Sequence, residues 1–177
     1  MAIVIKGRKV VTDNWLLLEC AADGTPPAVP PAGDVIVPLP LWQAQRGQLL
    51  ARPARLGLRL EPHDDPAAID ADLGLFGVIA VNFPTFSDGR GYSIARLLRE
   101  RYRYHGELRA IGEAVRDHLF FMASCGFDAF QLRDDQDPEV ALTAFTDFSE
   151  AYQTSVARPQ PLFRRRVLAA RDGIDLS

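Results

Sequence analysis

The sequence has little cysteine and little histidine, and these shortages exclude several kinds of metal site. Its two cysteines, Cys20 and Cys125, lie far apart and in no CxxC pattern. Iron–sulfur clusters and structural zinc sites need several thiolates at close spacing, so this chain cannot build one alone. The three histidines show no ligand spacing such as H-E-x-x-H. We therefore predict no metal site, and the residues assign no cofactor.

Long apolar runs and a strong charge excess are also missing. No apolar run approaches the roughly 20 residues that a membrane helix needs, and the N-terminus lacks the pattern of a signal peptide. The formal net charge is -3 and the pI is about 5.6, which argues against binding nucleic acid or an anionic membrane surface. We expect a cytoplasmic protein that binds neither, and association into a homo-oligomer stays open.

The 177 residues suffice for one domain with a full core. Two apolar runs flank Lys6-Gly7-Arg8-Lys9, which predicts an N-terminal β-hairpin. A loop rich in proline and glycine, DGTPPAVPPAGD, follows it. We expect a hairpin and loop over residues 1–33, an α/β domain over residues 34–157, and a C-terminal tail over residues 158–177.

Predicted strands and helices alternate from Asp34 onward. The run FGVIAVNF, Phe76 to Phe83, is nearly all apolar and predicts a central strand that is covered on both faces. Such alternation favours an α/β fold with a mainly parallel sheet built from repeated βαβ units. A three-layer sandwich is favoured at this length, and a barrel-like arrangement is the alternative.

In parallel α/β folds, ligands bind at the carboxyl ends of the strands. This rule selects residues 38–42, 61–64, 82–93, 112–113 and 131–134. The loop from Asn82 to Ser93 is the longest of these and leads into a helix rich in arginine. The residues predicted to bind a ligand are Asn82, Asp88, Gly89, Arg90, Gly91, Tyr92, Ser93 and Arg109.

The chemistry of this loop suits a small anion. Gly89 and Gly91 would allow positive φ and a close approach of the ligand to the backbone. The following helix would direct its N–H groups toward the anion, and Arg90, oriented by Asp88, would bind an oxyanion with its planar fork. However, the same residues are typical of an ordinary turn before a capped helix. The sequence does not separate these two interpretations.

Other interpretations of the segment are also open. Ser93 lies in a run that approximates a nucleophile elbow, but the last position holds alanine. Arg96, Arg99 and Arg103 recur at helical spacing, which indicates either a solvated face or a surface that docks an acidic partner. Arg109 alternates with apolar residues in a predicted strand, so it needs a partner if buried, and Asp117 is one candidate.

A longer run carries a family resemblance. FPTFSDGRGYSIARLLRER, followed by GELRAIGEAVRDHLFFMASCGFDAF, resembles the bacterial domain-of-unknown-function family 934. Members are commonly labelled as oxidoreductases involved in sulfite reduction. The resemblance implies an accessory protein or oxidoreductase of assimilatory sulfate or sulfite reduction that binds a small oxyanion or phosphorylated metabolite. It also implies that sulfite reductase pathway proteins are partners. The alternative is a non-catalytic module that docks a reductase through the arginines.

Overall fold

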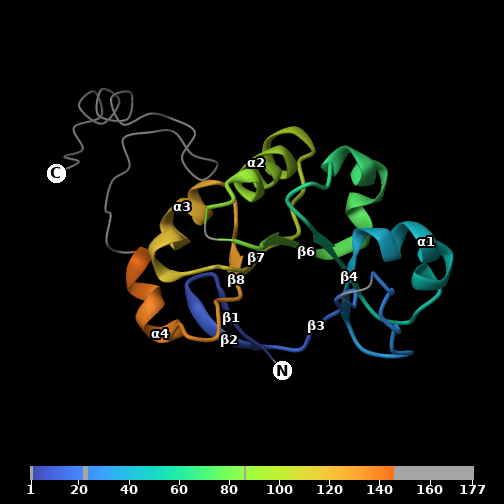
Figure 1. Ribbon diagram of the computed structural model, residues 1–177, viewed down its shortest axis with the longest axis horizontal. Coiled ribbons are helices and arrows are strands. Elements are labelled where there is room, and N and C mark those ends of the chain that lie inside the picture. The colour runs from blue at the N-terminus through green and yellow to red at the C-terminus, as the bar shows by residue number, and fades with distance from the viewer. Residues whose placement is uncertain (1, 22–23, 86, 146–177) are drawn as a thin grey trace, which may run out of the picture.

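The fold is a mixed α/β arrangement around one curled sheet (Figure 1). The computed structural model describes residues 2–21, 24–85 and 87–145. The predicted tail, residues 158–177, lies outside this part of the chain. The strands are β1 (Ala2–Lys6), β2 (Lys9–Asp13), β3 (Leu16–Leu17), β4 (Val35–Pro38), β5 (Leu56–Leu60), β6 (Phe76–Phe83), β7 (Glu107–Gly112) and β8 (Ala129–Phe130).

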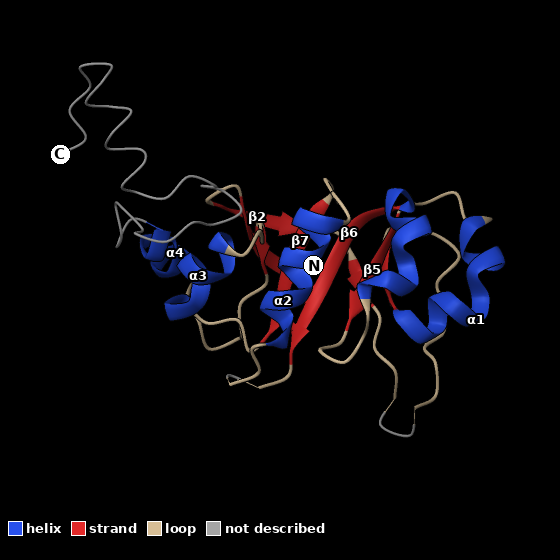
Figure 2. Cartoon of the chain, turned by 90° about the horizontal axis from the view of Figure 1, so that it is seen from above, coloured by secondary structure: helices blue, strands red, loops and turns tan. Residues whose placement is uncertain are grey.

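The helices connect and flank these strands. The α-helices are α1 (Leu39–Leu50), α2 (Arg90–Arg96), α3 (Leu119–Ser124) and α4 (Pro138–Ala141). The tighter and wider helical turns are the 3₁₀ helices η1 (Pro66–Leu75), η3 (Arg116–His118) and η4 (Leu142–Phe145) and the π-helix η2 (Leu97–Arg101). α1 and α4 lie at opposite ends of the sheet (Figure 2).

The sheet is mostly, but not purely, parallel. Its strand order is β2-β1-β8-β7-β6-β5-β4-β3. The run from β3 to β8 is parallel throughout, whereas β1 pairs antiparallel with both β2 and β8. The crossovers are not copies of one unit, because a 3₁₀ helix joins β5 to β6 and an α-helix joins β4 to β5. The parallel sheet is confirmed, and a strictly repeated βαβ unit is not.

The two edge strands of this sheet, β2 and β3, are consecutive in the chain. Only Asn14 and Trp15 separate Asp13 of β2 from Leu16 of β3. Three residue steps span at most about 11 Å, so the two edges lie close together. A sheet of this width meets that condition only by curling, and it forms half of a barrel. The fold is therefore nearer to the barrel-like alternative than to the three-layer sandwich that the sequence favoured.

The two faces of the sheet have different cores. On the outer face, Ile79 and Leu108 pack with Ile94, Leu98 and other apolar side chains of the helices in one large cluster. The helices form an arc around this side (Figure 1). On the inner face, a smaller cluster consists of Trp15, Ile36, Val78, Ala80 and Ile111. Trp15 and Leu17, from the chain before β4, thus pack on the inner face, where a sandwich would have a second layer of helices.

Local signals in the sequence predicted several elements correctly. The hairpin forms as expected, with Gly7 at φ 53° and Arg8 at φ 63° in its two-residue turn. The pairs Asp65-Pro66 and Asp137-Pro138 predict helix starts, and the two aspartates do cap η1 and α4, since their carboxylates accept hydrogen bonds from backbone N–H groups of the first turn. The predicted strand Phe76–Phe83 is β6. The spacing of Val115, Leu119 and Met122 predicts a helix over Glu113–Cys125, but the structure is helical there only from Arg116 to Ser124.

Strands β1 and β3 come from the predicted hairpin region, residues 1–33, and they join the same sheet as the strands of residues 34–157. Among the described residues, no helix is both long and apolar enough to cross a membrane.

Candidate functional site

A polar cleft lies over the carboxyl ends of the parallel strands. Its cavity volume is about 300 Å³. β6 and β7 contribute its central residues, and the segments after β3 and β8 contribute its rim. The lining residues include Glu19, Asn82, Gly112, Glu113, Arg133 and Asp134. This is the end of a parallel sheet at which α/β proteins place their ligands.

Asn82, at the end of β6, is the most buried polar side chain of the cleft, with 9% of its surface exposed. Its Nδ2 donates a hydrogen bond to Glu61 Oε2 at 2.8 Å. The alternation along β6 places Asn82 on the inner face with Val78 and Ala80. Since the Glu61 bond uses the amide nitrogen, the amide group has a fixed orientation in the cleft.

A chain of charged hydrogen bonds extends from Asn82 to the edge of the sheet. Arg59 Nε donates to Glu61 Oε1 at 2.7 Å, and Arg59 Nη1 donates to Glu19 Oε1 at 2.6 Å. Arg59 is largely buried, with 15% of its side chain exposed, whereas Glu19 is 65% exposed. Each charged group in this series of hydrogen bonds has a partner, so these side chains keep their positions in the cleft without a ligand.

Gly112 brings the backbone of β7 against Asn82. Its φ is +82°, and a Cβ at this position would lie 2.5 Å from Phe83 O and 2.6 Å from Asn82 Oδ1. Both the conformation and the contact therefore require glycine. The close approach leaves the cleft floor without a side chain between Asn82 and Glu113.

Arg133 lies on the opposite rim. It donates to Glu113 Oε2 from Nη1 at 2.6 Å and to Asp135 Oδ1 from Nε at 2.6 Å. Hydrogen bonds to Asp135 and Glu113 raise the pKa of Arg133, so it stays charged.

The carboxylates of the cleft outnumber its cations. The carboxylates of the lining are Glu19, Glu113 and Asp134, and its guanidinium group is Arg133; the adjoining Glu61 and Arg59 add one charge of each sign. The electrostatic potential inside the cleft therefore favours a cation or a hydrogen-bond donor over an anion.

The predicted anion loop has a different geometry from the cleft. Arg90 donates to Asp88 from Nε at 2.9 Å and from Nη2 at 2.7 Å, and its backbone N–H also donates to Asp88. This hydrogen bonding to Arg90 lowers the pKa of Asp88. The Arg90 side chain is 63% exposed. The fork that was expected to bind an oxyanion is thus occupied by Asp88, which is the arrangement of an ordinary capped turn.

The two glycines of this loop do not have the role that was predicted for them. Gly89 has φ -80°, and Gly91 is not among the glycines with positive φ. Gly91 is buried, and a Cβ there would lie 2.7 Å from Cζ of Phe83. Glycine is therefore needed at position 91 for packing of α2 on β6, and the expectation of positive φ was wrong.

Tyr92 packs against other aromatic rings, and Ser93 faces solvent. The Tyr92 ring packs against Phe83 and Phe121, with ring centroids 5.0 and 4.8 Å apart, and its hydroxyl lies 3.4 Å from His118 Nδ1. Burial raises the pKa of Tyr92. Ser93 is exposed on α2. Of the predicted ligand residues in the loop, Asn82 alone lines the cleft; ligand binding by the others stays a prediction.

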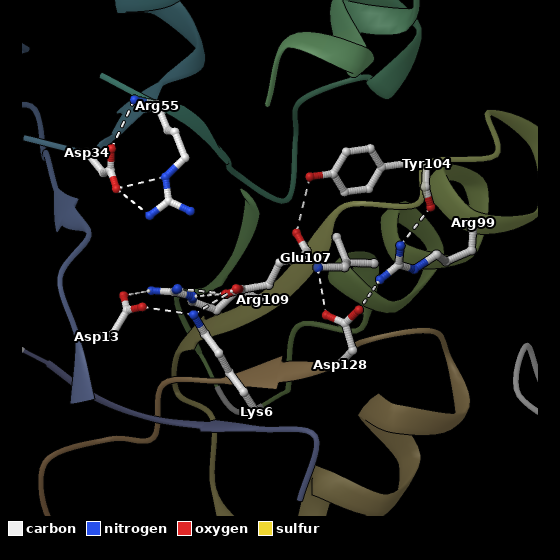
Figure 3. Close-up of polar contacts among 10 residues, drawn as sticks. Lys6, Asp13, Asp34, Arg55, Arg99, Tyr104, Glu107, Arg109 and Asp128 are labelled. Carbon is white, nitrogen blue, oxygen red and sulfur yellow. Dashed lines mark hydrogen bonds and ion pairs between the residues drawn. The ribbon is translucent and has the colours of Figure 1, made fainter. Parts of the chain in front are cut away.

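Arg109 lies away from the loop, inside the curled sheet (Figure 3). It is 1% exposed, and its Nη1 donates to Asp13 Oδ2 at 2.8 Å while its Nε donates to Glu107 Oε1 at 2.8 Å. Lys6 Nζ closes a ring by contacting Asp13 at 2.9 Å and Glu107 at 2.8 Å. The partners of Arg109 are therefore Asp13 and Glu107, and the suggestion of Asp117 was wrong.

The three arginines predicted to dock a partner do not share one face. Arg96 is exposed and contacts Glu100 at 3.4 Å. Arg99 has 12% of its side chain exposed, and it donates to the carbonyls of Tyr104, Gly106 and Gly126. Arg103 lies beyond the end of η2 with φ 54°. The helical spacing does not place Arg103 beside Arg96 and Arg99, because the helix ends at Arg101. Docking of a partner by these arginines stays a prediction.

The sequence alone missed most of the cleft. The rule of carboxyl ends did select residues 61–64, 112–113 and 131–134, but the longer loop was preferred. Arg59 carried a signal as well, since a charged residue alternates there with three leucines in a strand (LGLRL). Its partner Glu19 is distant by 40 residues, so no local pattern connects the two.

The chain belongs to a bacterial family of unknown function. The family model described as "Bacterial protein of unknown function (DUF934)" matches residues 57–163, which is more than half of the chain. No curated protein matches the chain, and no solved structure does. The match covers Glu61, Asn82, Gly112 and Arg133 of the cleft, while Glu19 precedes it. Within the described residues, no group of three or more His, Cys, Asp or Glu side chains is placed to hold a metal.

Proposed function

We propose that the protein binds a small polar metabolite in the carboxyl-end cleft and thereby serves assimilatory sulfite reduction as a cytoplasmic accessory protein. The location of the site rests on geometry. The link to sulfite reduction, the oxidoreductase label and the reductase partners rest on the family resemblance alone.

One observation carries the location. The cleft joins a fixed and buried amide, Asn82, to a floor where Gly112 leaves the backbone uncovered, and both lie at the carboxyl ends of central strands. Sites of this kind suit small ligands because their polar groups are oriented before the ligand arrives. The Asp88–Ser93 loop lacks this feature, since its one arginine is exposed and already paired.

The charge of the cleft decides the class of ligand. Carboxylates outnumber guanidinium groups there, and Arg133 already bridges Glu113 and Asp135. A sulfite or sulfate ion would have to displace one of these carboxylates from Arg133. A ligand that carries an amine can instead pair with Glu113 or Asp134 and donate to the oxygen of Asn82. The cleft thus suits an amine-bearing metabolite of the pathway better than sulfite itself.

Thermal-shift measurements test both the location and the class. Alkylamines and amino acids should raise the Tm of the wild-type protein, and sulfite, sulfate and phosphate should raise it less. The shift should disappear in Asn82→Ala and in Glu113→Gln, which keeps the shape of Glu113 and removes its charge. Arg90→Ala is the matched control, and it should retain the full shift.

The contrary outcomes are distinct. If Arg90→Ala loses the shift and Asn82→Ala keeps it, the ligand binds at the Asp88–Ser93 loop and our location is wrong. If oxyanions stabilise the protein and Arg133→Ala removes the effect, the charge argument is wrong. If neither group of compounds changes the Tm, the proposal fails.

The role in sulfite reduction has its own test. A bacterium that lacks this gene should grow poorly with sulfite as sulfur source and normally with sulfide, because the block lies between the two. The wild-type gene should restore growth on sulfite, and the Asn82→Ala form should not. Normal growth of the deletion strain on sulfite would contradict the role.

A further inference from the structure

A second cleft lies at the amino ends of β6 and β7, the opposite end of the sheet from Asn82. Its cavity volume is about 430 Å³. Phe76 and Asn82 are six positions apart on β6, so the two clefts are separated by roughly 20 Å along the strand. The lining residues that matter here are Leu73, Phe76, Tyr102, Arg103, Tyr104 and His105.

The aromatic wall of this cleft is held rigidly. The Tyr104 hydroxyl donates to Phe76 O at 3.0 Å, and the side chain is 5% exposed. Arg99 Nη1 donates to Tyr104 O at 2.7 Å and to Gly106 O at 2.8 Å. These bonds fix the segment between η2 and β7, so the backbone of the cleft needs no rearrangement to receive a ligand.

Arg103 combines strain with an unused charge. Its φ is 54°, a left-handed conformation that a residue with a Cβ adopts at a cost. Within the described part of the chain, neither Arg101 nor Arg103 forms an ion pair, whereas Arg90, Arg96 and Arg99 each contact a carboxylate. Arg101 instead lies over the Tyr102 ring at 5.5 Å. Among the described residues, Arg103 is therefore an arginine of the cleft lining without an ion-pair partner, and it lies next to the half-buried Tyr102.

We propose that this cleft binds a mononucleotide or a similar ligand in which a phosphate is joined to a planar ring. The Arg103 guanidinium offers two parallel N–H donors to a phosphate, and His105 adds a further donor at the same rim. Tyr102, which is half-buried in the lining, supplies the apolar face on which a planar ring packs. Asp70 is the one carboxylate in the lining, so the cleft is less acidic than the one at the carboxyl ends.

Isothermal titration with AMP tests this proposal on the full-length protein. AMP should bind more tightly than inorganic phosphate or adenosine, because it alone carries both groups. Arg103→Gly should weaken AMP at least about tenfold, since it removes one charged bond to phosphate. Glycine accepts the same φ, so the backbone is preserved. Tyr102→Leu should weaken AMP at least about fivefold through lost stacking.

Two control variants distinguish this cleft from the rest of the surface. Arg96→Ala removes an exposed arginine outside the cleft and should leave AMP affinity unchanged. Asn82→Ala should also leave it unchanged, so failure of one site does not imply failure of the other. The proposal is overturned if AMP shows no binding, if Arg103→Gly binds AMP as tightly as wild type, or if ribose 5-phosphate matches AMP.

Discussion

Arg109 depends on three neighbouring charges for its place inside the sheet. A guanidinium that is 1% exposed has lost nearly all contact with water, which costs several kcal/mol unless other groups compensate. Asp13 and Glu107 accept its hydrogen bonds, and Lys6 balances the second negative charge. Arg109 Nη2 lies 2.6 Å from Glu107 Oε1 without the geometry of a hydrogen bond. The ring of four charges is therefore nearly, but not fully, satisfied.

Replacement of Arg109 by methionine should lower the free energy of unfolding by about 3–5 kcal/mol, because two carboxylates would then share Lys6 alone in a buried place. Urea unfolding followed by circular dichroism measures the change. Arg90→Ala is the control on an exposed arginine with one carboxylate partner, and it should unfold close to wild type. If Arg109→Met and Arg90→Ala have the same urea midpoint, the buried charge ring does not stabilise the fold more than the exposed ion pair does.

The free energy of unfolding at acid pH provides a second test of the same charge ring. Burial opposes ionisation of Asp13, but hydrogen bonds from Arg109 and Lys6 outweigh it and lower the pKa of Asp13. The pKa of Asp13 is lower in the folded state than in the unfolded state, where it is about 3.9, so its ionised form stabilises the fold above that pH. This stabilisation is lost as the pH falls through the folded pKa. The difference between wild type and Arg109→Met should therefore shrink below about pH 4.

At the scale of elements, the segment from Asp88 to Arg103 illustrates how packing replaces an apparent ligand motif. α2 lies on β6 through Gly91, whose missing side chain makes room for the Phe83 ring. Phe83 is itself held by Tyr92 and Phe127, with centroids 5.0 and 5.8 Å away. These two rings restrict the movement of the Phe83 side chain. Gly91 is therefore needed for packing, whereas Gly89 is not.

Gly91→Ala should destabilise the protein and Gly89→Ala should not. The new Cβ at position 91 would lie 2.7 Å from the Phe83 ring, whereas at position 89 the nearest atom is Tyr92 Cδ2 at 4.0 Å. Overpacking costs about 1–3 kcal/mol, which exceeds the gain of up to roughly 1 kcal/mol for alanine over glycine in a helix. Urea midpoints for both variants check this. A larger loss for Gly89→Ala would contradict the packing role.

At the scale of the molecule, the N-terminal hairpin is part of the sheet and not an appendage. β1 pairs with β8 through Ile5 and Lys6, and the two residues after β2 carry the chain to β3 at the other edge. Lys6 and Asp13 also supply half of the charges around Arg109. The family match begins at residue 57, so structure that precedes the match completes the sheet and the charge ring.

Deletion of residues 2–13 should therefore abolish cooperative unfolding. The truncated chain would lose the antiparallel strands, expose one edge of β8 and leave Arg109 with Glu107 as its one acidic neighbour in the ring. Near-ultraviolet circular dichroism and urea unfolding measure the loss. Arg109 and Glu107 would still balance each other in charge, so Arg109→Met in the truncated chain should not restore the cooperativity. A truncated chain that unfolds cooperatively would contradict the role of the hairpin.

Part of this structure was predictable because its causes are local. The turn at Gly7-Arg8, the caps Asp65 and Asp137, and the apolar strand Phe76–Phe83 each depend on residues a few positions apart. The site was less predictable. A glycine-flanked arginine is the same in sequence whether its fork is free or bound to Asp88, and this distinction is geometric.

The sequence by itself determined the α/β class, the parallel run of strands, the hairpin and the family, since each follows from spacing or from a long matched run. Only the tertiary structure decided the curl of the sheet, the burial of Arg109 and the position of the cleft. Those features join residues distant in the chain, such as Arg109 with Asp13 across 96 positions and Arg59 with Glu19 across 40. Contacts of that kind depend on which strands become neighbours, and no local pattern encodes strand order.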